Sequence, residues 1–597
     1  MRKIQLGMRT ALAIGLVTAS ACGDDDVSPI DRPDAQTADA ATDGGGPTAP
    51  LDSSAPPLDA TQPAPDAAQD AGPIAKRPNI LLIVADDLGY SDLGVFGGEI
   101  STPNIDALAS SGRILTDHHS GFTCAPTRSM LISGTDHHLV GLGRMGAGTG
   151  AQAGKPGYEG VLNDRALSIA ELLRDGGYHT YIAGKWHLGS GDTQSPLQRG
   201  YEKSFVLLPG VSTFFSELSS PPTEAQTKNY REDGQYVTPP ADFYQTDFYT
   251  DKLISYFDAQ RGDDKPFYAF AAYTSPHWPM QAPESFIDRY KGKYDEGYEV
   301  IRARRFARQK ELGIIPQDAV AANLLPVTAE RPGWTELTPE QNALEARRME
   351  IYAAMVENLD WNIGRLVKHL KDIGEYDDTF IFFQSDNGAE GRNADRATAN
   401  NTLQNLGRPG SYVGVGVRWA EVSATPFRLW KAYSPEGGHS VPAIAHLPKQ
   451  TSASAKFKGL THLTDLAPTF LEIAGVQDPG SSYKGRSVHP ITGKSLLPVL
   501  EERATFVRDE NTVLADEQDT HRYVRRGRWK LLWLGPPFGL TPSAWQLYDL
   551  QTDRAEINDV SALHPDIVAE LTAEWEAYVQ RVGVVLGQPG GGGGGGG

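Results

Sequence analysis

The chain has 597 residues with 40% hydrophobic and 9% aromatic content, which is ordinary for a globular enzyme and leaves room for a large domain and a smaller one. Its formal net charge is -20, and residues 23–73, with eleven Asp and one Arg, hold -10 of it. The rest of the chain is still acidic, which argues against nucleic-acid binding, because that function needs basic surface. Its two cysteines, Cys22 and Cys124, allow one disulfide at most.

The amino terminus has the pattern of an export signal. Residues 1–10 are basic and residues 11–21 are apolar and small, and this core is shorter than the about 20 apolar residues of a transmembrane helix. Cys22 follows Ala-Ser-Ala, which is similar to a bacterial lipoprotein cleavage site, although alanine stands where leucine is usual. We therefore expect residues 1–22 to be a lipoprotein-like signal peptide, with an ordinary signal peptide as the alternative.

Two segments have compositions typical of disorder. Residues 23–76 are rich in Ala, Asp and Pro and lack aromatic residues, so they cannot bury enough apolar surface to fold. They are expected to form a linker, either a simple tail or a spacer that lifts an enzyme off a membrane, and residues 589–597 a flexible glycine tail. We expect an exported protein, periplasmic or a cell-envelope lipoprotein, whose membrane contact is limited to a lipid anchor.

Four apolar runs are predicted to be buried strands, and polar residues follow each of them at once. The runs are residues 80–85, 178–183, 267–272 and 379–383. Continuous apolar runs of this length are typical of parallel strands covered on both faces, and helical patterns lie between them near residues 102–112, 168–174 and 351–370. The alternation predicts an α/β sheet, and ligands bind beyond the carboxyl ends of its strands. We therefore expect the four polar clusters at one edge of the sheet.

Two of these clusters offer oxygen ligands for a metal ion. Asp86 and Asp87 follow the first run, and Asp386 and Asn387 follow the last. Carboxylate and amide oxygens favour Ca²⁺ or Mg²⁺ over a soft metal. The alternative for a single pair is that strand-end aspartates cap turns, but two pairs at one edge favour a metal site.

A second pair of patterns indicates chemistry on an anion. Cys124, Pro126 and Arg128 precede an apolar stretch, and proline is favoured in the first turn of a helix, so the cysteine is predicted at a helix amino terminus, where anions are stabilised. Lys185 and His187 bring a cation close to an imidazole, which suits anion binding and proton transfer. The alternatives are a buried structural cysteine and a tight turn around a packed tryptophan.

Taken together, the motifs resemble those of the formylglycine-dependent (type I) sulfatase family. CAPTRSMLISG at 124–134 is similar to the first sulfatase signature and GYHTYIAGKWHLG at 177–189 to the second, and VADDLG, TSPHWP and SDNG appear in family order. The resemblance covers roughly residues 77–585 and is strongest to bacterial arylsulfatases.

The resemblance implies an alkaline-phosphatase-like α/β fold with two domains. Residues 77–505 would form a catalytic domain, with a large, mainly parallel sheet flanked by helices. Residues 506–588, which include GRWKLLW and WQLYDLQTDRAEINDV, would form a smaller domain with an antiparallel sheet and a helix.

The resemblance also implies an activity, the hydrolysis of sulfate esters such as aryl sulfates. The family's nucleophile is a hydrated formylglycine, which a formylglycine-generating enzyme makes from the motif cysteine, here Cys124. Pro126 and Arg128 match positions that this maturation enzyme reads, and Arg128 would also hold the nucleophile. The substrate would be a small sulfate ester, and the sequence leaves aryl, alkyl and carbohydrate sulfates as alternatives.

The remaining roles follow from the same resemblance. Lys185 would contact sulfate, His187 would help the sulfated hydrate to collapse, and His277 and Lys431 would assist the leaving oxygen. One calcium ion per chain would be held by four residues: Asp86, Asp87, Asp386 and Asn387.

Some features depart from the family pattern or leave a choice open. Thr127 stands where many members have serine, and Ser440 stands where members often have arginine, which leaves the anchoring of the loop around Lys431 open. Phosphodiester or phosphonate hydrolysis is an alternative activity, and a binding protein without catalysis is disfavoured because the motif residues are present. Five more histidines could line the pocket, although the default expectation for them is a surface or packing position: His118, His119, His137, His138 and His439.

Overall fold

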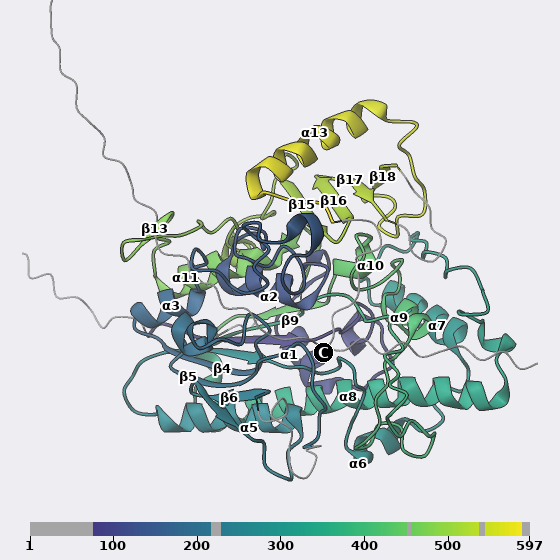
Figure 1. The fold of residues 1–597 in the computed structure, drawn as a ribbon, viewed down its shortest axis with the longest axis horizontal. Helices are drawn as coiled ribbons and strands as arrows, with labels where there is room; N and C mark the ends of the chain where they lie inside the picture. Colours follow the sequence, from purple (N-terminus) through teal and green to yellow (C-terminus); the bar gives the residue numbers. More distant parts are fainter. Residues whose placement is uncertain (1–75, 217–227, 450–454, 536–543, 588–597) are drawn as a thin grey trace, which may run out of the picture. The chain divides into compact units, whose positions relative to one another are not determined.

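A ten-stranded sheet forms the centre of the computed structural model, which describes residues 76–216, 228–449, 455–535 and 544–587 (Figure 1). The five central strands are parallel neighbours. In order across the sheet they are β9 (Thr379–Ser385), β1 (Asn79–Ala85), β8 (Phe267–Ala272), β4 (His179–Lys185) and β5 (Lys203–Leu207). The expected α/β sheet is therefore confirmed.

Short strands extend the sheet on both sides, and most of them run antiparallel to their neighbours. Beyond β9 come β10 (Ala443–His446), β2 (Arg113–Leu115) and β11 (Ala455–Phe457), and beyond β5 come β6 (Tyr230–Glu232) and β7 (Gln235–Val237). Two-stranded pairings lie outside this sheet: β3 (His118–His119) with β12 (Thr461–His462), and β13 (Ser482–Tyr483) with β14 (Arg486–Ser487).

Helices cover both faces of the sheet, which explains the continuous apolar runs. Leu81 and Ile83 of β1 pack into one core and Leu82 and Val84 into the other. The first core includes α1 (Pro103–Ser110), α5 (Gln245–Ala259), α6 (Glu284–Ile287), α7 (Tyr298–Glu311), α8 (Pro339–Asp372) and α9 (Val417–Ser423). The second includes α2 (Cys124–Ser133), α3 (Ile169–Asp175), α11 (Leu466–Ala474) and α12 (Leu497–Leu500), and Figure 1 shows α5 and α8 opposite α2, α3 and α11.

The predicted strand over residues 178–183 is displaced toward the site, because β4 continues to Lys185. Gly184 has a φ of 125°, and a Cβ there would lie 1.8 Å from the carbonyl oxygen of Ala272 on β8. Only glycine allows this close approach, so the strand continues through a residue type that is usually found in turns.

The start of α1 shows how the long helix α8 supports the sheet edge. Thr102 is the N-cap residue of α1 and Pro103 is its first residue, but the threonine side chain makes no capping bond. Instead, the carboxylate of Asp360 on α8 accepts hydrogen bonds from the backbone N–H groups of Asn104 and Ile105, at 3.0 and 2.8 Å. A carboxylate at a helix amino terminus also interacts favourably with the helix dipole.

The smaller antiparallel sheet implied by the resemblance is present near the carboxyl end. It consists of β15 (Val513–Gln518), β16 (His521–Arg526), β17 (Trp529–Trp533) and β18 (Gln546–Asp549), and α13 (Pro565–Val582) packs on it. We call these four strands the C-terminal sheet. All of the described residues belong to one compact unit.

Several predictions fall outside the described residues. They concern the signal peptide over residues 1–22 with its Cys22, the linker of residues 23–76 apart from its last residue, and the tail of residues 589–597. Among the helices that the structure describes, none has the length and apolar character needed to span a membrane.

Candidate active site

Four neighbouring parallel strands end at one edge of the large sheet, as predicted. Asp86 and Asp87 follow β1, and Asp386 and Asn387 follow β9 next to it. On the other side of β1, the segment after β8 carries His277, while Lys185 ends β4 and His187 follows it. Asp87 and His187 have positive φ values of 68° and 57°, an uncommon backbone conformation that clusters at functional sites.

Cys124 reaches this edge from a helix rather than from a strand. It is the first residue of α2, as predicted, and its Sγ lies 3.4 Å from Oδ1 of Asp86. The side chain is 1% exposed. Burial, with a contribution from Asp86, raises the pKa of the Cys124 thiol, so an unmodified cysteine would stay protonated at neutral pH.

Arg128 lies one helical turn after Cys124 and connects two of the strand ends. Its Nε and Nη2 lie 3.1 and 3.0 Å from Oδ2 of Asp386, and Nη2 lies 3.7 Å from Asp86. Its Nη1 donates to the carbonyl oxygen of Lys185 at 3.1 Å. The guanidinium group is therefore fixed by α2, β9 and β4 at once, beside the cysteine.

Two lysines face the same carboxylates from different elements. Nζ of Lys185 lies 2.6 Å from Asp86, and Nζ of Lys431, in the loop between α9 and α10 (Glu436–His439), lies 2.7 Å from Asp87. Burial opposes charge on both lysines, yet the neighbouring carboxylates hold the pKa of each above its usual value. Both side chains are therefore buried cations.

Burial favours the neutral form of the two histidines of the predicted site. Nδ1 of His277 contacts the carbonyl oxygen of Trp278 at 2.5 Å, which leaves Nε2 facing Asp87 Oδ2 at 3.5 Å. Burial, helped by Lys185 and opposed by Asp87, lowers the pKa of His277 to about 3. Burial and the nearby cations also place the pKa of His187 well below its usual range, and its Nδ1 has no hydrogen-bond partner among the described residues.

The four predicted metal ligands offer oxygen donors, which suit a hard divalent cation, and Asp86 and Asp87 belong to a buried group with Cys124 and His277 whose ligand atoms all lie within 4.8 Å of one another. Oδ1 of Asn387 and Oδ2 of Asp87 are both buried. Within the described part of the chain, neither atom accepts a hydrogen bond. Burial, together with the neighbouring Asp86, raises the pKa of Asp386 to about 6. A divalent cation among these oxygens would satisfy the unpaired atoms and keep Asp386 ionised.

Two further residues belong to the site that the sequence prediction missed. Oε2 of Glu390 lies 3.4 Å from Nζ of Lys431. Oε1 of Gln518, on the C-terminal sheet, accepts a hydrogen bond of 2.6 Å from Oγ1 of Thr123, the residue before Cys124. Glu390 stands three residues after the Asp386-Asn387 pair, so its position in the chain was a usable signal, whereas Gln518 has no local pattern that points to the site.

The five additional histidines are buried, which agrees with packing, one of the two positions expected by default. His119 lies 3.0 Å from Glu436, and His138 lies between Asp136 and Glu517, at 3.0 and 3.2 Å. These groupings of histidine and carboxylate are held by their own hydrogen bonds and ion pairs.

Comparison with known proteins agrees with this geometry. Residues 78–476 match the family model described as Sulfatase, and residues 431–581 match the model described as N-sulphoglucosamine sulphohydrolase, C-terminal. An uncharacterized sulfatase of Schizosaccharomyces pombe is 39% identical over 534 residues, which cover 86% of this chain and 95% of that protein. An arylsulfatase of Klebsiella aerogenes is 38% identical over 434 residues, covering 71% and 92%.

Solved structures show the same fold. The crystal structure of Ps i-CgsB in complex with k-i-k-neocarrahexaose has a TM-score of 0.60 and 24% identity, and the match covers 84% of this chain and 92% of that one. The family model spans more than half of the chain, and two relatives exceed 30% identity over most of their length. The chain therefore belongs to the sulfatase family and is a sulfuric ester hydrolase.

Proposed function

We propose that this enzyme cleaves sulfate esters, aryl sulfates among them, with a hydrated formylglycine at position 124 and one calcium ion. The observation that carries the proposal is the contact of Cys124 with Asp86, a carboxylate that Lys185 holds at 2.6 Å. This contact supports the proposal because position 124 lies against a predicted metal ligand that is itself bound by a predicted sulfate-binding cation.

Formylglycine would supply what a buried thiol does not. Its hydrate carries two hydroxyls: one attacks sulfur as the alcohol or phenol departs, and loss of the proton of the other restores the aldehyde and releases sulfate. Because burial raises the pKa of the Cys124 thiol, the unmodified residue would be a poor nucleophile here. Arg128, whose guanidinium is fixed beside position 124, would hold the nucleophile and offset charge on the sulfuryl oxygens.

The balance of charge supports a requirement for a divalent metal. The site holds three cations and four carboxylates, which leaves a formal charge of -1. The cations are Arg128, Lys185 and Lys431, and the carboxylates are Asp86, Asp87, Asp386 and Glu390. Such a site would repel a sulfate ester, which is itself an anion. A calcium ion held by the three aspartates and Asn387 would change the formal charge to +1, and it would supply Lewis acidity toward a sulfuryl oxygen.

An aromatic wall supports an aryl substrate. Trp278 is partly exposed, and its ring centroid lies 4.9 Å from that of His277 and 5.9 Å from that of Tyr412. A flat leaving group that departs toward His277 would meet this surface, and aromatic rings gain free energy by packing against one another. The 38% identity to an arylsulfatase points the same way.

A panel of esters tests the proposed activity. We expect the purified, matured protein to release inorganic sulfate from aryl sulfates with a higher kcat/KM than from alkyl or carbohydrate sulfates. The same assay includes a phosphate diester and a phosphonate monoester, because the sequence left phosphorus chemistry as an alternative. Faster turnover of either phosphorus ester than of every sulfate ester would overturn the proposal.

The role of His277 has its own expected result. His277→Ala should slow cleavage of alkyl sulfates by about 10²–10⁴-fold, the usual contribution of a general acid, and slow nitrophenyl sulfates far less, because a nitrophenoxide leaves without a proton. Since Nδ1 contacts the Trp278 carbonyl, Nε2 is the atom that would carry this proton, and the sulfate anion would favour its protonation.

Single-turnover rates are the proper measurement for this comparison, because slow sulfate release would mask the first step. His179→Ala is a matched control, since His179 opens β4 at the opposite end of the strand and pairs with Glu202 and Asp263. Equal slowing of both ester types would assign His277 to sulfate binding and make Lys431 the better candidate for the acid.

A further inference from the structure

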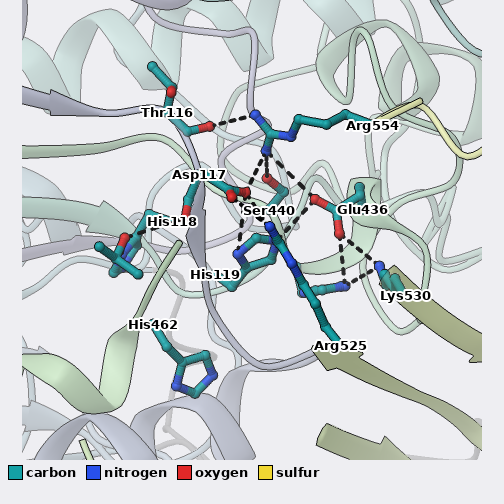
Figure 2. Close-up of polar contacts among 12 residues, drawn as sticks. Thr116, Asp117, His118, His119, Glu436, Ser440, His462, Arg525, Lys530 and Arg554 are labelled. Carbon is teal, nitrogen blue, oxygen red and sulfur yellow. Dashed lines mark hydrogen bonds and ion pairs between the residues drawn. The ribbon is translucent and has the colours of Figure 1, made fainter. Parts of the chain in front are cut away.

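We propose that Lys530 and Arg554, which belong to the C-terminal region, are positioning residues for Lys431. They act through Glu436 and Ser440, two members of the loop that carries this lysine (Figure 2). The inference rests on the proposed function, which places Lys431 at the substrate. We call residues 428–440 the lysine loop.

One side of the lysine loop is attached to the active site. The backbone N–H of Lys431 donates to the carbonyl oxygen of Ala389 at 3.0 Å, and that of Ala432 donates to the carbonyl oxygen of Phe122 at 2.8 Å. Phe122 precedes Cys124 by two residues. The position of the lysine ammonium group relative to position 124 therefore depends on the path of this loop.

The backbone of the lysine loop has an unfavourable conformation. Leu429 and Ala432 have positive φ values of 58° and 76°, which are unfavourable for residues with a Cβ. A Cβ on Gly438 would lie 1.9 Å from the carbonyl oxygen of Tyr433, so the loop folds tightly back on itself. Contacts from outside the loop must therefore stabilise this conformation.

The first such contact is a buried ion network around Glu436. Its Oε1 lies 2.8 Å from Nζ of Lys530 on β17, and its Oε2 lies 3.0 Å from Nε2 of His119. Its backbone N–H donates to Glu556 at 2.9 Å, and Glu556 in turn lies 2.8 Å from Lys530. Glu436, Lys530 and Glu556 are all at most 1% exposed, so little water is available to replace a lost partner.

The second contact comes from Arg554, just after β18. Its Nη2 lies 3.3 Å from Oγ of Ser440, 3.0 Å from Asp117 and 3.7 Å from Glu436, and its Nη1 donates to the carbonyl oxygen of Thr116 at 2.9 Å. Figure 2 shows the guanidinium group between Thr116, Ser440 and Glu436. The anchoring of this loop, which Ser440 left open in the sequence, is thus provided by an arginine 114 residues further along the chain.

A small movement of Lys431 would matter because its buried ammonium group is held at 2.7 Å from Asp87. Misplacement of a catalytic group by about 1 Å can cost about 10²-fold in rate. Removing the contacts that Lys530 or Arg554 makes with the lysine loop should therefore displace Lys431 and reduce activity, although neither residue touches the site.

A double-mutant cycle with Lys431 tests this mechanism. Arg554→Met, and separately the charge-balanced pair Lys530→Met with Glu556→Gln, should each lower kcat/KM for a sulfate ester by about 10- to 100-fold. In a Lys431→Met background the same changes should lower it by no more than about threefold, because the group they position is gone. Effects that simply multiply in that background would overturn the proposal.

Two further variants control for stability. Arg528→Met removes an arginine that pairs with Asp549 on the same sheet without touching the lysine loop, and its kcat/KM should stay within about twofold of the wild type. Arg554→Lys keeps the charge and should show the Arg554→Met pattern at smaller amplitude, so the cycle stays measurable if a methionine variant does not fold. The proposal would also be contradicted by the following pair of results. Arg554→Lys would have the kcat/KM of the wild type, while Arg554→Met would lose kcat/KM by the same factor whether or not Lys431 is present.

The double-mutant cycle and the ester assay test the two proposals separately. Turnover of sulfate esters by the wild type reports on the function alone. The cycle can be run with whichever ester the wild type cleaves, so a negative cycle on an active enzyme rejects only the positioning role.

Discussion

Replacing Asp386 with alanine is expected to remove both the bound metal ion and the activity. Asp386 is one of the four predicted oxygen ligands, and its burial beside Asp86 makes its charge costly even with Arg128 in contact, so a bound cation would stabilise the ionised form. Elemental analysis of the wild type should find about one hard divalent ion per chain, with calcium predominating, and the variant should contain almost none. We expect kcat/KM to fall by about 10³-fold or more, because both the metal and the geometry of Arg128 are lost.

Two controls separate metal loss from unfolding. Asp386→Asn keeps the shape of the side chain, so its thermal unfolding temperature should stay closer to the wild type while metal content still falls. Asp360→Asn changes another buried aspartate, which caps α1 and lies outside the metal site, and it should retain the metal. Full activity in rigorously metal-free wild-type protein would reject the metal site.

Cys124→Ala is expected to reduce turnover of sulfate esters by roughly 10⁴-fold or more, since removing a covalent nucleophile costs up to about 10⁶-fold in other hydrolases. The wild-type peptide that holds residue 124 should show sulfur replaced by oxygen in its mass spectrum, and it should react with carbonyl reagents. Mixed preparations should have a kcat proportional to the modified fraction.

Expression without a formylglycine-generating enzyme provides the matched control for this prediction. The protein should then carry an intact thiol at position 124, fold as the matured protein does, and have the activity of Cys124→Ala. A fully active preparation with an unmodified thiol would show that the cysteine itself is the nucleophile.

The sequence predicted the placement of the strand-end residues because a simple physical rule governs it. Parallel strands covered on both faces are apolar throughout, and their carboxyl ends meet at one edge, so Asp86, His277 and Asp386 had to lie near one another. The limits of β4 were harder to predict. The pairing of Gly184 with Ala272 depends on how closely two strands approach, and no local pattern encodes that distance.

The hydrogen bonds and ion pairs that hold the lysine loop could not be predicted from the sequence. Glu436 meets Lys530 and Glu556 across 94 and 120 residues of chain. Glu436 and Glu556 stand in short polar stretches that are typical of any surface, and Lys530 is a single charge within the apolar strand β17. Burial turns the three into a network, and burial is a property of the assembled sheets rather than of any one segment.

The contact between Thr123 and Gln518 spans 395 residues, and this separation sets an order of events during synthesis. At about 5–20 residues per second, a ribosome needs roughly 20–80 s to make the chain between them. Throughout that interval the sulfatase signature has left the ribosome, while the strand that covers Thr123 does not yet exist. A modifying enzyme that acts during synthesis would therefore have a window of tens of seconds in which the cysteine is reachable, and the C-terminal sheet would close it.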